Sequence, residues 1–116
     1  MPNEDSIRDD KEDEILELDY RNFSIVINKN KLTLVDFWAP WCGACQTMFA
    51  IFSKLSKSYS DKIIFARVNI DNNPKIASEY EVLSIPSFIL FKDGQPIKGL
   101  IGTVTESRLK EIMEKL

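Results

Sequence analysis

The stretch Val35-Asp36-Phe37-Trp38-Ala39-Pro40-Trp41-Cys42-Gly43-Ala44-Cys45 decides the fold of this chain of 116 residues. It begins inside the run Leu32–Trp38, whose mostly apolar residues predict a buried strand covered on both faces. A turn follows at residues 39–41, and an amphipathic helix is predicted from Cys42 to about Tyr59. This strand–turn–helix unit places the two cysteines of the chain where the helix begins.

The spacing and the placement of these cysteines both indicate redox chemistry. Residues i and i+3 share a helix face, so Cys42 and Cys45 can close a disulfide once their Cα atoms lie within about 7 Å. Cys42 falls at the helix N-terminus, where free N–H groups and the helix dipole favour a negative charge. A helix start is one of the settings that lower a cysteine pKa, and the thiolate is the form that attacks disulfides. The motif therefore predicts exchange of electrons between a dithiol and a disulfide.

The rest of the sequence predicts alternating strands and helices. A helix is expected from Asp19 as N-cap to about Asn28, and the Asp93-Gly94 pair marks a hairpin turn. Helical crossovers imply parallel strands first, and the hairpin adds an antiparallel pair at the end. The prediction is therefore an α/β fold with a mixed sheet and helices on both faces. Further strands are expected at 15–18, 63–70, 87–91 and 96–101. Asn73-Pro74 is expected to open a short helix, and Thr105 to cap a last helix that carries Leu109, Ile112, Met113 and Leu116.

Acidic charge is concentrated at the N-terminus. Met1–Glu14 contains seven acidic and two basic residues, whereas the whole chain has 18 acidic and 15 basic residues and a net charge of −3. We expect residues 1–14 to be a disordered acidic extension, because Ile7 is their one sizeable apolar residue. Residues 15–116 are expected to form a single domain.

Composition excludes several classes of protein. No apolar run approaches the roughly 18 residues of a membrane span, and no basic stripe favours nucleic acid. The N-terminal segment lacks the basic and apolar regions of a secretory signal. We expect a cytoplasmic monomer with neither a membrane nor a nucleic acid as partner.

Three separate stretches resemble the thioredoxin family, and the resemblance extends over residues 15–116. Val35–Cys45 resembles the active-site segment, Ile85-Pro86-Ser87 the cis-proline loop, and Phe91-Lys92-Asp93-Gly94 the hairpin. A C-x-x-C motif alone would be weak, because zinc and haem sites share it. The resemblance implies a thioredoxin fold and an enzyme that reduces protein disulfides through a reversible Cys42–Cys45 disulfide, with no bound cofactor.

The resemblance also implies partners and cellular roles. Substrates would be disulfide-containing proteins, and an NADPH-dependent flavoprotein thioredoxin reductase would supply the electrons. The protein would thereby serve electron transport and cell redox homeostasis. Three positions depart from the family pattern: Ala44 replaces a proline between the cysteines, Gln46 a lysine, and Ala50 a proline within the helix. The lost charge at Gln46 should raise the Cys42 pKa. The sequence does not predict whether this protein is a stronger or a weaker reductant than an ordinary thioredoxin.

Roles follow for the three residues expected to be catalytic. Cys42 would attack the substrate disulfide, and Cys45 would then attack the Cys42 sulfur and release the reduced substrate. Asp36, an acid within an apolar strand, would accept the Cys45 proton, because burial without a partner raises a carboxyl pKa toward neutrality. The alternative for Asp36 is an ordinary buried salt bridge with Arg67, a supporting residue that tempers its pKa.

The resemblance further implies a surface for substrate. Pro86 would follow a cis peptide bond that exposes the backbone of Ile85 to an extended substrate. Trp38, Ala44 and Arg67 would support the site rather than contact substrate. Residues expected to form an apolar rim for protein substrates, besides Pro86, are Trp41, Gly43, Ile85 and Gly102.

Three alternatives remain open at this level. An oxidase or isomerase would use the same motif, with a different redox potential. A zinc or iron–sulfur site needs four soft ligands, so two cysteines and no histidine would require a dimer; we expect no metal. A binding module would use the fold as a scaffold and would retain its partner after both cysteines were replaced.

Overall fold

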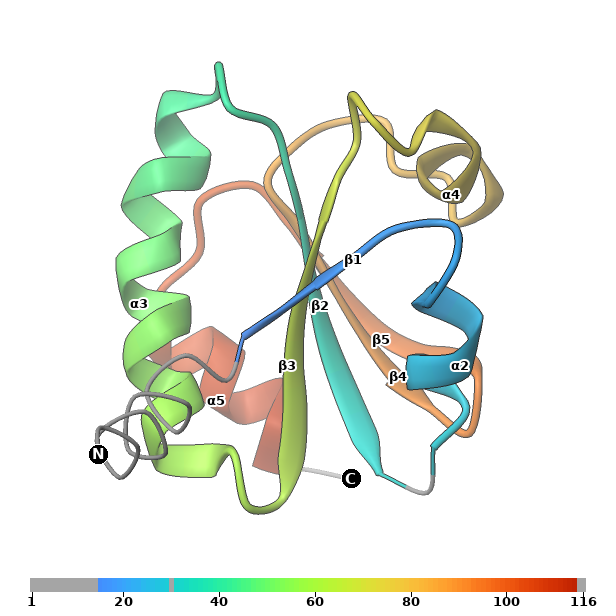
Figure 1. Cartoon of the computed structure of the whole chain (residues 1–116). Helices are drawn as coiled ribbons and strands as arrows, with labels where there is room; N and C mark the ends of the chain where they lie inside the picture. Colours follow the sequence, from blue (N-terminus) through green and yellow to red (C-terminus); the bar gives the residue numbers. More distant parts are fainter. Residues whose placement is uncertain (1–14, 30, 115–116) are drawn as a thin grey trace, which may run out of the picture.

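The computed structural model describes residues 15–29 and 31–114 (Figure 1). The predicted acidic extension, residues 1–14, lies outside the described residues. A five-stranded sheet in the order β1-β3-β2-β4-β5 forms the centre of the molecule. Its strands are β1 (Leu16–Leu18), β2 (Leu32–Trp38), β3 (Ile63–Asn69), β4 (Ser87–Lys92) and β5 (Gln95–Ile101). The helices are α2 (Phe23–Ile27), α3 (Gly43–Tyr59), α4 (Pro74–Glu79) and α5 (Glu106–Glu114).

Pairing in the sheet is mixed, as the sequence predicts. β1 and β2 both run parallel to β3, whereas β4 is antiparallel to β2 and to β5. Asp93 and Gly94 join β4 to β5 with φ angles of 50° and 83°. Two successive left-handed residues are what a tight two-residue hairpin requires, which explains the Asp-Gly pair.

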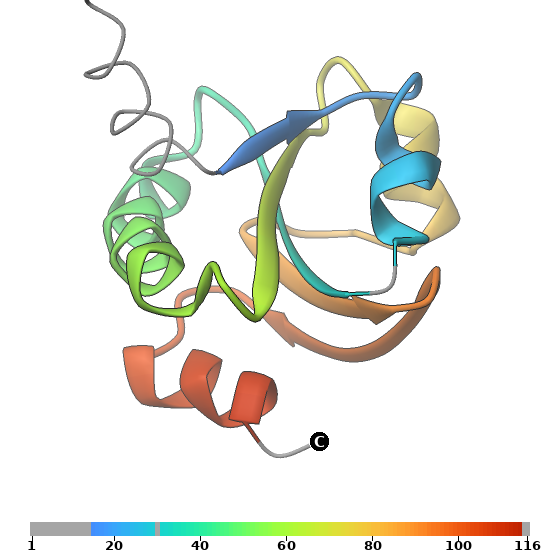
Figure 2. The same cartoon turned by 60° about the horizontal axis from the view of Figure 1, so that its bottom comes forward.

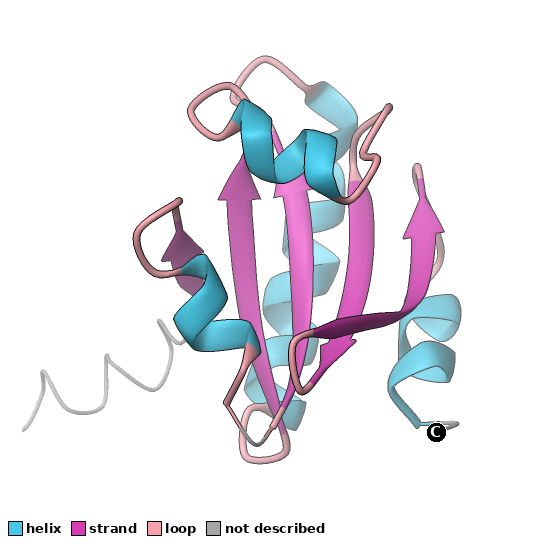
Figure 3. Ribbon diagram, turned by 90° about the vertical axis from the view of Figure 1, so that its right-hand side faces the viewer, coloured by secondary structure: helices cyan, strands magenta, loops and turns pink. Residues whose placement is uncertain are grey.

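Helices cover both faces of the sheet (Figures 2 and 3). Successive strand residues point to opposite faces, so β2 serves two cores. Leu34 packs in one core with residues of α3 and α5, such as Phe52 and Leu109. Val35 and Phe37 pack in the other core with residues of α2 and α4. The run Leu32–Trp38 is therefore apolar because both of its faces are buried.

The predicted start of the first described helix is wrong. Asp19 does not cap it: α2 begins at Phe23, and Asn22 occupies the N-cap position. The Asp19 carbonyl accepts hydrogen bonds from the N–H groups of Asn22 and Phe23, while the Asp19 carboxylate binds Arg21. Because the Asp19 carboxylate binds Arg21 instead of capping a helix, the residues after Asp19 form a turn where the sequence predicts the first helical turn.

The other two predicted caps behave differently from one another. Thr105 precedes α5, and its hydroxyl accepts a hydrogen bond from the Arg108 N–H at 3.1 Å, as a helix cap does. Asn73 stands at the N-cap position of α4, but its side chain makes no capping bond. It instead accepts from the Tyr20 N–H at 3.2 Å and donates to the Asn69 carbonyl at 3.0 Å, which ties the start of α4 to β3 and to the segment after β1.

Candidate active site

Cys42 caps the N-terminus of α3. Its extended backbone (φ −93°, ψ 107°) precedes the first helical residue, and its sulfur accepts a hydrogen bond from the Cys45 N–H at 3.1 Å. The two cysteines form a disulfide, with Cα atoms 5.2 Å apart, and both are buried. A sulfur at this place faces the unpaired N–H groups and the positive end of the helix dipole. The helix start therefore favours negative charge on Cys42 once the disulfide is reduced.

Asp36 is completely buried on the face of the sheet that α3 covers. It is two residues before Trp38 on β2, and neither carboxylate oxygen has a hydrogen-bond partner in the described part of the chain. Loss of water raises the pKa of this carboxyl to about 7; the Arg67 guanidinium opposes the rise and the Glu17 carboxylate adds to it. Near neutral pH the carboxyl can therefore both accept and release a proton.

Arg67 lies beside Asp36 without binding it directly. The two residues are paired across β2 and β3, yet the Asp36 oxygens accept no hydrogen bond from the guanidinium. The guanidinium carbon instead lies 3.8 Å from the centre of the Trp38 ring and 4.2 Å from that of Phe49. The alternative of an ordinary buried salt bridge is therefore wrong, because aromatic rings hold the guanidinium away from the carboxylate.

Glu17 completes a line of charges that the sequence analysis missed. It is paired with Arg67 across β1 and β3, and it accepts a hydrogen bond from the Trp38 indole N–H at 3.2 Å. Partial loss of water raises the Glu17 pKa although the residue is exposed at the edge strand, and Arg67 and the Trp38 bond act in the opposite direction. We refer to Glu17, Arg67 and Asp36 as the charged row.

The loop before β4 and the loop after β5 meet next to the cysteines. The Ile85–Pro86 peptide bond is cis, as the resemblance implies, and the Gly102 N–H donates to the Pro86 carbonyl at 2.7 Å. Ile85 and Trp38 pack against a buried cluster that contains both cysteines. The structure thus gathers residues that are separated by sixty positions in the sequence.

Exposed apolar residues surround this region. Trp41, just before Cys42, is 68% exposed, and its indole N–H donates to the Asp71 carboxylate at 3.0 Å. Gly43 and Ala44 are exposed as well. Two residues that sequence analysis missed are even more exposed: Leu83, two positions before Ile85, at 94%, and Ile101, at the end of β5, at 72%.

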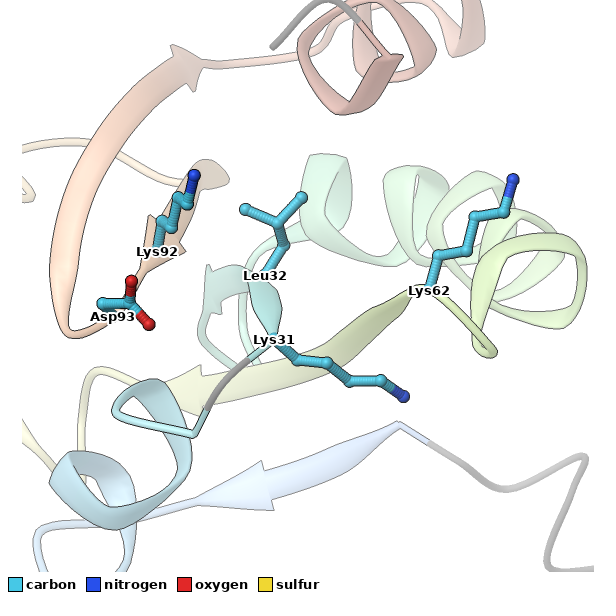
Figure 4. Close-up of a pocket in the computed structure, with 5 residues that line it drawn as sticks. All are labelled: Lys31, Leu32, Lys62, Lys92 and Asp93. Atoms are coloured by element: carbon cyan, nitrogen blue, oxygen red, sulfur yellow. The ribbon is translucent and has the colours of Figure 1, made fainter.

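Other parts of the described chain lack comparable chemistry. A cleft of about 400 Å³ lined by Lys31, Leu32, Lys62, Lys92 and Asp93 lies where β2 and β3 begin, at the other end of the sheet, and its lysines do not converge on one point (Figure 4). Among the described residues, no three His, Cys, Asp or Glu side chains gather where they could hold a metal ion. No helix in residues 15–29 or 31–114 has the length and apolar character to span a membrane.

The thioredoxin family model matches residues 14–115 of the chain, which is nearly its whole length. The chain belongs to the thioredoxin family. A thioredoxin of Alicyclobacillus acidocaldarius is 42% identical over 89 residues, covering 77% of this chain and 85% of the relative. Thioredoxin 1 of Synechococcus elongatus is 39% identical over 90 residues, covering 78% and 84%.

Solved structures of thioredoxins share the fold. Mitochondrial thioredoxin 3 of Saccharomyces cerevisiae, in its oxidized form, matches with a TM-score of 0.81 at 34% identity, covering 91% of this chain and 99% of the other. A Malassezia sympodialis thioredoxin matches with a TM-score of 0.80 at 33% identity, covering 85% and 87%. With its disulfide-forming pair at the motif position, the protein is a dithiol–disulfide oxidoreductase that acts on protein disulfides through Cys42 and Cys45.

Proposed function

We propose that the reduced protein passes two electrons to a protein disulfide in two exchange steps. The Cys42 thiolate attacks one substrate sulfur, breaks the substrate S–S bond and forms a mixed disulfide, and one substrate thiolate leaves. Cys45 then loses its proton, attacks the Cys42 sulfur and releases the second substrate thiolate. The enzyme disulfide closes as the substrate disulfide is reduced, so electrons and sulfur bonds balance.

Asp36 is the proposed proton acceptor for Cys45. Its burial, its unpartnered oxygens and its pKa of about 7 support this role, because an acceptor works best when its pKa lies near the operating pH. Cys45 is buried at the start of α3, the helix that covers the face of the sheet holding Asp36. The proton taken from Cys45 then leaves with the substrate thiolates or passes to water.

Protein substrates are proposed to bind at the exposed apolar rim. We assign to it the exposed Trp41 and Gly43, the half-buried Ile85 and Gly102, and Pro86, whose side chain is buried and which contributes through its cis peptide bond. The exposure of the neighbouring Leu83 and Ile101 supports a wider apolar surface than the sequence predicted. The cis peptide before Pro86 leaves the backbone of Ile85 as a pairing partner for an extended substrate segment.

The proposed electron donor is an NADPH-dependent flavoprotein thioredoxin reductase, which returns the Cys42–Cys45 disulfide to the dithiol. We also propose that the protein works as a monomer in the cytoplasm, in electron transport and redox homeostasis, with no bound cofactor. Reducing compartments keep thiols reduced, which suits a donor of electrons. Turnover of NADPH by purified protein and such a reductase tests the partner.

The observation that carries the proposal is the Cys42 sulfur at the helix start, accepting the Cys45 N–H. The test is reduction of insulin disulfides with dithiothreitol as donor. We expect the wild-type protein to accelerate the reaction and the double variant Cys42→Ser/Cys45→Ser to lose all acceleration. A double variant that still captures protein partners, together with an inactive wild-type protein, would favour the scaffold alternative.

A redox titration against glutathione distinguishes a reductase from an oxidase or isomerase. A low reduction potential, at which the Cys42–Cys45 couple is already oxidised while substrate disulfides are reduced, supports the reductase, and a high, strongly oxidising potential contradicts it. Because Ala44 and Gln46 depart from the family pattern, this measurement has to be made on this protein.

A further inference from the structure

Three charged residues occupy neighbouring positions across three strands. Glu17 on β1 is in register with Arg67 on β3, and Arg67 is in register with Asp36 on β2. Paired residues of adjacent strands point to the same face of a sheet, here the face covered by α3. The charged row therefore alternates acid, base, acid, with Arg67 between two carboxylates that compete for its charge.

Aromatic rings fix the central member of the row. Trp38 and Phe49 place their ring centres 3.8 Å and 4.2 Å from the Arg67 guanidinium carbon, a typical cation–π arrangement. The Trp38 indole N–H binds Glu17 at 3.2 Å. Glu17 thus binds the indole whose ring lies against the Arg67 guanidinium.

The two ends of the row have different surroundings. Asp36 is fully buried, whereas Glu17 is exposed at the edge strand and lines an open cleft of about 500 Å³ together with Trp38 and Asn69. In the described part of the chain, Arg67 from β3 and Glu17 from β1 are the charged groups that act on Asp36, and β4 places Phe88 in register with it. Cys45 lies on α3, the helix that covers this face of the sheet. Arg67 favours the ionised form of Asp36, and the Glu17 charge opposes Arg67.

We propose that Glu17 is a positioning residue for the resolving step, acting on Asp36 through Trp38 and Arg67. Its hydrogen bond keeps the Trp38 ring over the guanidinium, and its charge offsets part of the guanidinium charge. Asp36 therefore stays a good proton acceptor near neutral pH instead of being held as a weakly basic carboxylate. This inference rests on the role proposed above for Asp36.

The decisive variant is Glu17→Gln. Glutamine keeps an oxygen that can accept the Trp38 N–H but removes the negative charge, so it separates electrostatics from simple packing. Asp61→Asn is the matched control: it removes one acidic charge from the exposed turn between α3 and β3, at the opposite end of the sheet (Figure 1). Glu17→Asp is the rescue variant, since it restores the charge.

The first measurement is the titration of the Asp36 carboxyl carbon by NMR in the oxidised protein. We expect its midpoint to fall by roughly half a pH unit in Glu17→Gln, the size of a unit charge at about 10 Å in a partly solvated setting. Asp61→Asn should leave the midpoint in place, and Glu17→Asp should restore most of it. An unchanged midpoint in Glu17→Gln overturns the inference, because a merely structural Glu17 would act through the retained Trp38 bond.

The second measurement separates the two exchange steps. Reduced protein reacts with an aromatic disulfide that releases one coloured thiolate on attack by Cys42 and a second on attack by Cys45. In Glu17→Gln we expect the pH profile of the second release to move down with the Asp36 midpoint, while the first release changes less than twofold. If Asp36→Asn slows the second release but Glu17→Gln leaves its pH profile unmoved, the role of Glu17 is rejected and that of Asp36 is kept. A normal second release in Asp36→Asn rejects the Asp36 role and the inference with it.

Discussion

The layer between the sheet and α3 has two parts that are chemically opposite. In one part, Phe52 packs its ring 5.2 Å from that of Phe65 and 5.9 Å from that of Phe88, with no polar atom to satisfy. In the other, Asp36 is buried with no hydrogen-bond partner in the described chain. The aromatic part stabilises the fold, whereas the buried Asp36 carboxyl costs stability and is the proton acceptor proposed above. Phe88, in register with Asp36, marks the boundary between them.

The largest expected effect is a loss of activity that leaves the aromatic part untouched. Cys42→Ser should abolish insulin reduction, because no other thiolate at the helix start can make the first attack. Cys45→Ser should still attack once and then accumulate a mixed disulfide, which mass spectrometry detects as an adduct on Cys42. Substantial insulin reduction by Cys42→Ser would mean that the attacking sulfur is assigned to the wrong residue.

The aromatic part predicts the opposite behaviour, a loss of stability without a change in chemistry. Phe52→Ala should lower the free energy of unfolding by about 3–5 kcal/mol, since it removes a fully buried ring and leaves a cavity. Urea denaturation of the oxidised protein measures this. The control is Ile25→Ala, whose side chain is 65% exposed and should change stability by about 0.5 kcal/mol or less. A Phe52→Ala loss as small as that of the control would contradict the contrast between the two parts.

Asp36→Asn should stabilise the protein, but only above acidic pH. Burial raises the native pKa from 3.8 to about 7, so the native protein keeps its proton while the unfolded chain loses it, and stability falls as the pH rises from about 4 to 7. The variant lacks this loss, so its advantage should reach at most about 4 kcal/mol above pH 7 and vanish below about pH 4. Denaturation at pH 3.5 and pH 8.5 measures both limits. A difference independent of pH would show that Asp36 is not the titrating group.

The same variant tests whether Asp36 takes part in the resolution of the mixed disulfide. Asp36→Asn should slow the resolution of the mixed disulfide more than the first attack, because only resolution needs a proton acceptor for Cys45. Rapid-mixing measurements of the two thiolate releases separate these steps. Equal slowing of both would make Asp36 a structural residue.

The smallest expected effect on stability is at the rim. Trp41→Ala should change the free energy of unfolding by about 0.5 kcal/mol or less, since its side chain is largely exposed. It should weaken kcat/KM for a protein disulfide roughly tenfold, as the loss of an aromatic contact residue does, and affect a small aromatic disulfide much less. Equal losses for both substrates would place Trp41 in the chemistry rather than in binding.

Local sequence patterns predicted the sheet and the position of the cysteines. The apolar run Leu32–Trp38 and the turn before Cys42 depend on neighbouring residues, whose periodicity is visible in one stretch. The resemblance added the cis peptide before Pro86. What failed locally was the start of α2, where Asp19 binds Arg21 rather than the helix N-terminus.

Long-range pairing produced what the sequence could not predict. The place of Glu17 depends on the register of β1 against β3, residues fifty positions apart, and no local pattern encodes that register. Whether Arg67 binds Asp36 or lies between Trp38 and Phe49 depends on side-chain packing across three elements. The exposure of Leu83 reflects the path of a loop, which apolar periodicity does not describe.

We propose that α3 holds the sulfur of Cys42, once reduced, as a thiolate at the start of the helix, and site-resolved alkylation tests this most directly. The reduced protein is treated with iodoacetamide between pH 5 and 9, and the modification of each cysteine is followed by mass spectrometry. We predict that Cys42 reacts at pH 6.5 on the order of ten times faster than cysteine in an unstructured peptide, with Cys45 far slower. A Cys42 that reacts no faster than the peptide thiol across this range would contradict it.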